Sequence, residues 1–88
     1  MSHFIVCYDI ANPKRLQRVH RKAVAHAQFL QYSVYYLDGT RQQLQDMLDE
    51  IEQEIEPKED DVRAYTVAPL KEAICLGRPW MPDDIYLV

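Results

Sequence analysis

The first apolar stretch of the chain constrains its fold more than any other feature. Phe4 to Tyr8 are five consecutive apolar or aromatic residues, and Asp9 follows them directly. Such a run predicts a strand buried on both faces. Asn12 is a suitable helix N-cap, and Pro13 suits the first helical position because its missing N–H has no intrahelical partner there. We therefore expect a strand that turns tightly into a helix, with a carboxylate where α/β-type sheets place their chemistry.

Hydrophobic periodicity predicts the next elements. A helix is expected from residue 13 to about residue 27, and its buried stripe recurs at spacings of three and four residues. The stripe comprises Leu16, Val19, Ala23, Val24 and Ala27. Residues 28–37 are rich in β-formers, and the imperfect alternation predicts two short strands with a kink or bulge around residues 31–33. Asp38-Gly39 predicts a turn.

A second helix and a last strand complete the pattern. Thr40 and Gln43 have the spacing of a capping box, and Pro57 is expected to end the helix that they open. Residues 62–67 predict the last core strand. The order β-α-β-β-α-β is that of an α+β, ferredoxin-like domain, with an antiparallel sheet and both helices on one face. We assign residues 1–67 to this core.

Residues 68–88 form a less regular tail. Gly77, Pro79 and Pro82 exclude a long helix, and residues 70–76 predict a short strand or a helical turn. Ile85 to Val88 read as an extra, apolar C-terminal strand. Such a strand is expected to pair with a sheet edge, either in this chain or in a second subunit, because a free apolar strand promotes aggregation. A chain of 88 residues buries limited surface, and dimerisation is a common remedy.

Charge is distributed unevenly along the chain. The net charge is −4, yet no acid occurs between Ile10 and Leu37, where five cations lie. Acids instead dominate residues 46–61. No apolar run approaches the roughly 20 residues of a membrane span, and Asp9 interrupts the only N-terminal apolar stretch. We expect a cytoplasmic protein without a membrane segment, in which the two cysteines, Cys7 and Cys75, are reduced.

Several residues are candidates for chemistry. The oxygen atoms of Asp9 suit a hard cation such as Mg²⁺, but the residues alone favour a helix cap or an Asx-turn. Tyr8 either orients Asp9, stacks on a base or lies in the core. Ser33 either donates to a phosphate or to Asp9, or occupies a bulge. The cations of the first helix lie away from its apolar stripe and are expected to be available to a phosphate ligand; they are Lys14, Arg15, Arg18 and Lys22.

Three segments together resemble the CRISPR-associated protein 2 family. They are the strand ending Tyr8-Asp9-Ile10 with its basic helix, the segment Leu30-Gln31-Tyr32-Ser33-Val34-Tyr35, and Asp61-Val62-Arg63-Ala64-Tyr65. The resemblance covers nearly the whole chain. It implies a homodimer in which two copies of Asp9 face each other across a two-fold axis and share one Mg²⁺ ion.

Three functions follow as hypotheses. The resemblance implies a CRISPR-associated, metal-dependent endonuclease that cuts RNA or DNA and takes part in spacer acquisition, with Asp9, Tyr8 and Ser33 as catalytic residues. The alternative within the family is a non-catalytic dimeric adaptor that bridges the CRISPR integrase and binds double-stranded DNA. The third is a small-molecule-binding regulatory domain, which predicts a Gly-rich ligand loop, and the chain has only two glycines.

Overall fold

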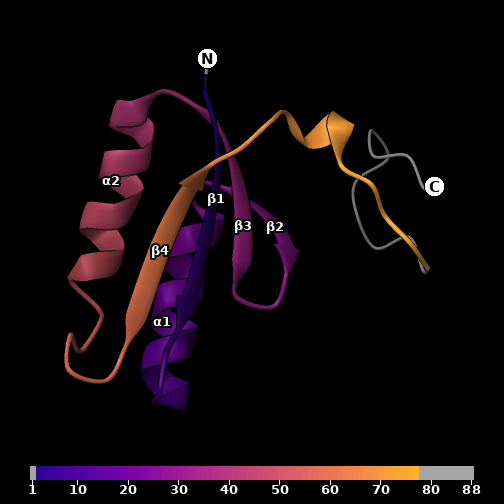
Figure 1. Cartoon of the computed structure of the whole chain (residues 1–88). Coiled ribbons are helices and arrows are strands. Elements are labelled where there is room, and N and C mark those ends of the chain that lie inside the picture. The colour runs from indigo at the N-terminus through magenta and orange to yellow at the C-terminus, as the bar shows by residue number, and fades with distance from the viewer. Residues whose placement is uncertain (1, 78–88) are drawn as a thin grey trace.

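A computed structural model describes residues 2–77, which form a four-stranded antiparallel sheet with two helices (Figure 1). The elements in chain order are β1 (Ser2–Asp9), α1 (Pro13–Val24), β2 (Gln28–Gln31), β3 (Val34–Gly39), α2 (Arg41–Glu52), β4 (Asp61–Thr66) and the short 3₁₀ helix η1 (Leu70–Glu72). The predicted α+β, ferredoxin-like order is confirmed. No helix in residues 2–77 is long and apolar enough to cross a membrane.

The sheet has the strand order β2-β3-β1-β4, so β1 is a central strand. It pairs antiparallel with β3 on one side and β4 on the other. Both helices contribute side chains to the main core, against the buried Phe4, Val6 and Tyr8 of β1. Ile5 and Cys7 point to the other, helix-free face and are only half-buried. The expected burial on both faces therefore holds for the helix side alone.

Helix α1 begins as predicted, because the Asn12 side chain accepts a hydrogen bond from the Arg15 backbone N–H at 3.0 Å. It ends at Val24, three residues before the expected end near Ala27. Val24 was predicted to lie in the buried stripe, but it is 45 % exposed. One residue step turns its side chain about 100° away from that of the buried Ala23.

Strands β2 and β3 form a hairpin whose pairing shifts between Phe29 and Gln31, as the kinked pattern predicted. The predicted turn at Asp38-Gly39 is wrong, because both residues belong to β3 and Gly39 pairs with Ser2. A Cβ atom on Gly39 would lie 2.1 Å from Gln43 Oε1, so a side chain there would displace the flexible Gln43 side chain that caps α2.

Helix α2 opens with the predicted capping box. Gln43 N–H donates to Thr40 Oγ1 at 3.1 Å, and Thr40 N–H donates to Gln43 Oε1 at 2.7 Å. The helix ends at Glu52, and turns at 53–54 and 57–59 precede β4. Its buried residues Leu44, Met47 and Ile51 pack in the main core.

Strand β4 was predicted as a core strand, but it lies at the sheet edge. Val62 is half-buried, whereas Tyr65 is 49 % exposed. An edge strand has a neighbour on one side only, which explains this exposure. After β4 the chain crosses over to the β2 side of the sheet (Figure 1). There Leu70 of η1 packs against Leu30 and Tyr36, on the face opposite α1 and α2. The helical-turn alternative for residues 70–76 is thus met by η1, and the expected strand at Ile85 to Val88 lies outside the described residues.

Candidate active site

Asp9 is the last residue of β1 and lies on the helix-free face at the end of the sheet. Successive side chains of a strand point to opposite faces, and Phe4, Val6 and Tyr8 pack among the helices. Asp9 therefore shares the face of Ile5. It is exposed and pairs in register with Asp61 of β4.

The Asp9 carboxylate makes no hydrogen bond or ion pair with any described residue. The helix cap is Asn12, so the interpretation of Asp9 as the N-cap of α1 is wrong. Asp61, directly opposite, accepts a hydrogen bond from Arg63 Nε at 2.8 Å. Of two neighbouring carboxylates, one is thus paired within its strand, and Asp9 keeps all its acceptor capacity for an external group.

The described residues of one chain do not by themselves form a complete metal site. Within residues 2–77, no group of three or more His, Cys, Asp or Glu side chains could hold a metal ion. Asp9 offers one carboxylate, and Mg²⁺ is commonly bound through one or two carboxylates while it keeps several waters. The donor chemistry fits Mg²⁺, provided that a second chain or a nucleic acid supplies the other ligands.

Tyr8 is a core residue, as one of its three interpretations predicted. Its hydroxyl shares a hydrogen bond of 2.7 Å with that of Tyr35, whose oxygen also lies 2.5 Å from Nδ1 of His20. The Tyr8 and Tyr35 rings stack with centroids 5.6 Å apart. Burial raises the pKa of both phenols, so both stay neutral. This network fixes the end of β1 on the helix side, and no hydrogen bond joins Tyr8 to Asp9.

Ser33 lies in the two-residue connection between β2 and β3. Its φ of 62° lies in the left-handed region, which costs a non-glycine residue roughly 1–2 kcal/mol. Its carbonyl oxygen accepts a hydrogen bond from the Tyr8 N–H at 3.2 Å. The hairpin turn is thereby tied to the end of β1, and Ser33 and Tyr8 line the same pocket.

Arg15 forms ion pairs with two acids of its own chain. Its Nε donates to Asp60 Oδ2 at 2.7 Å, and one terminal nitrogen lies 3.1 Å from both Asp60 Oδ1 and Glu59 Oε1. The Asp60 side chain has no exposed surface and also accepts hydrogen bonds from the backbone N–H groups of Ala11 and Glu56. In this structure Arg15 is therefore ion-paired within the chain, and its role in binding nucleic acid stays a prediction.

Two further cations of α1 face acids of α2 and its following turn. Arg18 Nε lies 3.3 Å from Glu54 Oε2, and Lys22 Nζ lies 4.0 Å from Glu50 Oε1. His26 also contacts Glu50. The sequence around α1 contains no acid, so these ion pairs could not be predicted from it; their acids lie in α2 and in the turn that follows.

Lys14 and Arg21 are the α1 cations without an ion pair in the described part of the chain. They are seven residues apart, which is close to two helical turns and places them on one side of the helix. Lys14 was a candidate for phosphate contact, whereas Arg21 was not. The spacing of seven residues was the signal that could have identified it.

Arg21 opens onto a pocket of about 780 Å³ between α1 and the β2–β3 hairpin. Its aromatic and titratable lining comprises Tyr8, His20, Arg21, Phe29, Tyr32 and Tyr35. We call it the aromatic pocket. It lies on the helix side of the sheet, whereas Asp9 lies on the helix-free face.

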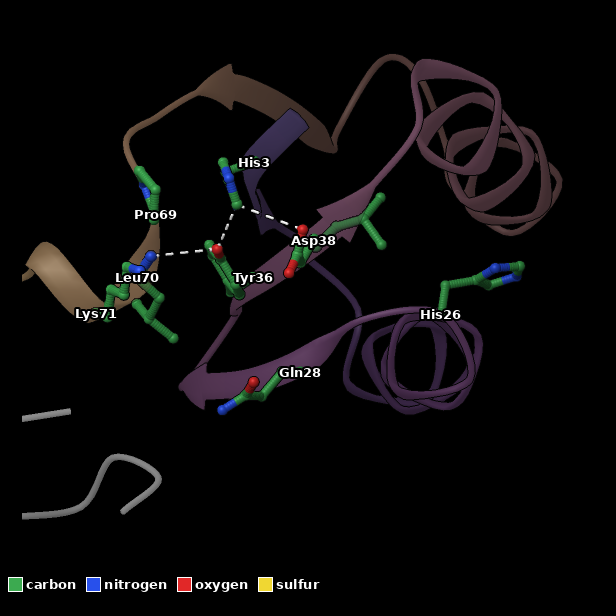
Figure 2. Close-up of a pocket in the computed structure, with 9 residues that line it drawn as sticks. His3, His26, Gln28, Tyr36, Asp38, Pro69, Leu70 and Lys71 are labelled. Carbon is green, nitrogen blue, oxygen red and sulfur yellow. Dashed lines mark hydrogen bonds and ion pairs between the residues drawn. The ribbon is translucent and has the colours of Figure 1, made fainter. Parts of the chain in front are cut away.

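A second pocket, of about 470 Å³, lies where the chain leaves β4 (Figure 2). His3 points towards Tyr36 and Asp38, with Nδ1 2.7 Å from the Tyr36 hydroxyl and 3.5 Å from Asp38 Oδ1. The Leu70 N–H donates to the same hydroxyl at 3.2 Å. These polar groups satisfy one another and fasten η1 to β1 and β3, which gives His3 a structural role.

Comparison with known proteins identifies the family. Residues 1–71 match the family model described as CRISPR associated protein Cas2. The chain is 39 % identical over 85 residues to the CRISPR-associated endoribonuclease Cas2 1 of Nitrosomonas europaea, covering 97 % of this chain and 81 % of that protein.

Solved structures agree in fold. The crystal structure of Streptococcus pyogenes Cas2 at pH 6.5 superposes with a TM-score of 0.67 at 30 % identity, over 75 % of this chain and 86 % of that one. A chain of a partial Cas6-RT-Cas1–Cas2 complex gives a TM-score of 0.69 at 22 % identity, over 83 % and 82 % of the two chains. With the sheet order and the Tyr8-Asp9 strand end already established, these matches show that the chain belongs to the CRISPR-associated Cas2 family.

Proposed function

We propose that this protein is a CRISPR-associated, metal-dependent endonuclease that hydrolyses phosphodiester bonds of RNA or DNA as a homodimer. The observation that carries the proposal is the exposed Asp9 carboxylate, which has no partner within residues 2–77, at the end of the central strand. Because this carboxylate makes no internal contact among the described residues, it contributes little to stability and is free to bind a cation. Relatives named CRISPR-associated endoribonucleases support the reaction class.

A homodimer would complete the site. Two copies of Asp9, brought together across a two-fold axis, would supply two carboxylates to one Mg²⁺ ion. Asp9 lies on the face opposite α1 and α2, and within residues 2–77 only η1 packs on this face, on its β2–β3 side, so a second chain would have access to Asp9. When bound, Mg²⁺ polarises a phosphate oxygen and makes a water molecule more acidic.

The remaining residues hold the site in place. The Tyr8–Tyr35–His20 network fixes the end of β1, and the Ser33 carbonyl ties the hairpin to the same point. Asp60 holds the Ala11 N–H two residues after Asp9. Lys14 and Arg21 would contact phosphates, and their lack of an ion pair within the described residues supports this role. The Ser33 hydroxyl is a further candidate to donate a hydrogen bond to a phosphate of the nucleic acid.

A non-catalytic adaptor is the second candidate. It needs only the cations Lys14 and Arg21 of α1, which have no ion pair within the described residues, and no metal ligand. In this role the dimer would hold double-stranded DNA through its phosphates and bridge an integrase subunit. The fold match to a chain of a Cas1–Cas2 complex is compatible with such an assembly.

The test is a cleavage assay on labelled single-stranded RNA, single-stranded DNA and duplex DNA, with Mg²⁺ or with a chelator. The nuclease proposal expects Mg²⁺-dependent products from at least one substrate. Absence of products from neutral to alkaline pH, together with retained binding of duplex DNA, would contradict it and favour the adaptor.

A further inference from the structure

The aromatic pocket has a lining that the structural roles above do not explain. Phe29 is 48 % exposed and Tyr32 is 74 % exposed, and both line the same concave space of about 780 Å³. Two large exposed rings at one pocket are unfavourable in water unless something covers them. The volume lies within the range of small-ligand sites.

The aromatic rings of the pocket differ in how they are held: Phe29 and Tyr35 contact other rings, whereas Tyr32 does not. Phe29 packs edge-on against His20 and Tyr35, with centroids 5.9 and 5.8 Å apart and interplanar angles of 82° and 73°. Tyr35 and Tyr8 are held by their shared hydrogen bond. Tyr32 makes no ring contact or hydrogen bond within residues 2–77. A planar ring that enters the pocket would meet a rigid aromatic wall and a ring free to stack.

The charge around the pocket selects an anion. Among residues 2–77, its lining contains no carboxylate, and Arg21 is the one always-charged side chain there. Arg21 Nε reaches only the Gln17 carbonyl oxygen, at 3.5 Å, so its guanidinium keeps donors for another group. The pocket is therefore suited to a planar ring that carries a negative charge beside it.

We propose that the aromatic pocket receives one unpaired nucleobase of a single-stranded nucleic acid, which stacks on Tyr32 and Phe29 while its phosphate contacts Arg21. A nucleotide joins a planar ring to a negative charge, and stacking on protein aromatics is available to every base. The inference rests on the proposed action on nucleic acid and adds a preference for unpaired strands. Because Asp9 lies on the other face, the pocket is a separate subsite.

The experiment compares three labelled probes of equal length by fluorescence anisotropy in a chelator, which prevents cleavage. The probes are single-stranded oligothymidylate, the same backbone with abasic sites, and a blunt duplex. Wild type is expected to bind oligothymidylate about tenfold more tightly than the abasic strand. Tyr32→Ala and Phe29→Ala should each reduce this preference, and Tyr32→Phe should keep it.

The matched controls separate this inference from the proposed function. Arg21→Ala should weaken binding of oligothymidylate and of the abasic strand alike, because both carry phosphates. If wild type binds oligothymidylate and the abasic strand equally, or if Tyr32→Ala weakens all three probes equally, the pocket inference is overturned and nucleic-acid binding stands. If no probe binds in the chelator, the pocket inference is overturned, whereas the nuclease proposal is decided by the cleavage assay with Mg²⁺.

Discussion

At the scale of the residue, Asp60 shows how a buried charge is stabilised. Its carboxylate has no exposed surface, yet Arg15 and two backbone N–H groups donate to it. The Arg15 guanidinium holds the pKa of this carboxyl far below its usual range. Asp60 thereby joins the turn after β1 to the loop before β4, and it fixes the backbone that follows Asp9.

Replacing Asp60 by asparagine is expected to destabilise the fold by about 2 to 3 kcal/mol, because charge-assisted hydrogen bonds are lost at a buried site. A carboxyl with a lowered folded pKa contributes stability that is present above its unfolded pKa of about 3.9 and is lost as pH falls towards the folded pKa. Urea unfolding of Asp60→Asn should therefore depend less on pH below about 4 than that of wild type.

Glu59→Gln is the matched control, because Glu59 contacts the same arginine but is 58 % exposed. Its effect should stay within about 1 kcal/mol, as for other surface pairs. Equal losses for the two variants would mean that Asp60 is no more than another surface partner of Arg15.

Local contacts of this kind were predictable from sequence, whereas distant ones were not. The Asn12 cap and the Thr40–Gln43 box were predicted because each joins residues three positions apart. Asp60 and Arg15 are 45 positions apart, and both belonged to runs of like charge. Their pairing depends on the return of β4 alongside β1, which a charge pattern does not contain.

At the scale of the element, α1 divides its cations between two tasks. Arg15, Arg18 and Lys22 hold the acidic elements that follow in sequence. Lys14 and Arg21 lie away from those acids. The basic run and the acidic run are therefore largely partners of each other, and only part of α1 is left for a nucleic acid.

The salt dependence of nucleic-acid affinity should separate these two tasks. The double variant Lys14→Ala, Arg21→Ala is expected to lower the slope of log affinity against log salt by about two units, one for each phosphate contact. Arg18→Ala, Lys22→Ala removes the same charge from the paired side and should leave the slope nearly unchanged. The reverse ranking would show that the paired cations exchange their acids for phosphates.

The elements themselves were largely predictable, and the errors have physical causes. Periodicity identified both helices and the hairpin, because their apolar patterns reflect burial directly. Strand β4 was predicted as a core strand because its composition is β-like, although edge position is a property of the whole sheet. Gly39 suggested a turn, but it lies in β3 beside the Gln43 side chain.

At the scale of the whole molecule, the residues that the structure describes cover one face of the sheet only in part. Both helices pack on the other face, and η1 covers the β2–β3 side. Ile74 and Leu76, which follow η1, are 76 % and 80 % exposed. The edge of β4 also has no neighbouring strand within residues 2–77. These features suit a second copy of the chain, as the proposed dimer requires.

Sedimentation equilibrium is expected to show a dimer at micromolar concentration. Deletion of residues 84–88 should raise the dimer dissociation constant, because it removes the apolar segment expected to pair with a sheet edge. An unchanged constant would remove this segment from the interface, and a stable monomer of the full chain would contradict the dimer.

The most direct test of the central claim is the cleavage rate of Asp9→Asn. Asparagine keeps the shape of aspartate but loses the charge that holds a hard cation, so Mg²⁺-dependent cleavage should fall by about a hundredfold or more. Thermal stability should change little, since Asp9 has no internal partner among the described residues. Asp38→Asn removes the same charge from the same face at the other end of the sheet, and it should cleave like wild type. Equal cleavage by wild type and Asp9→Asn would contradict the account.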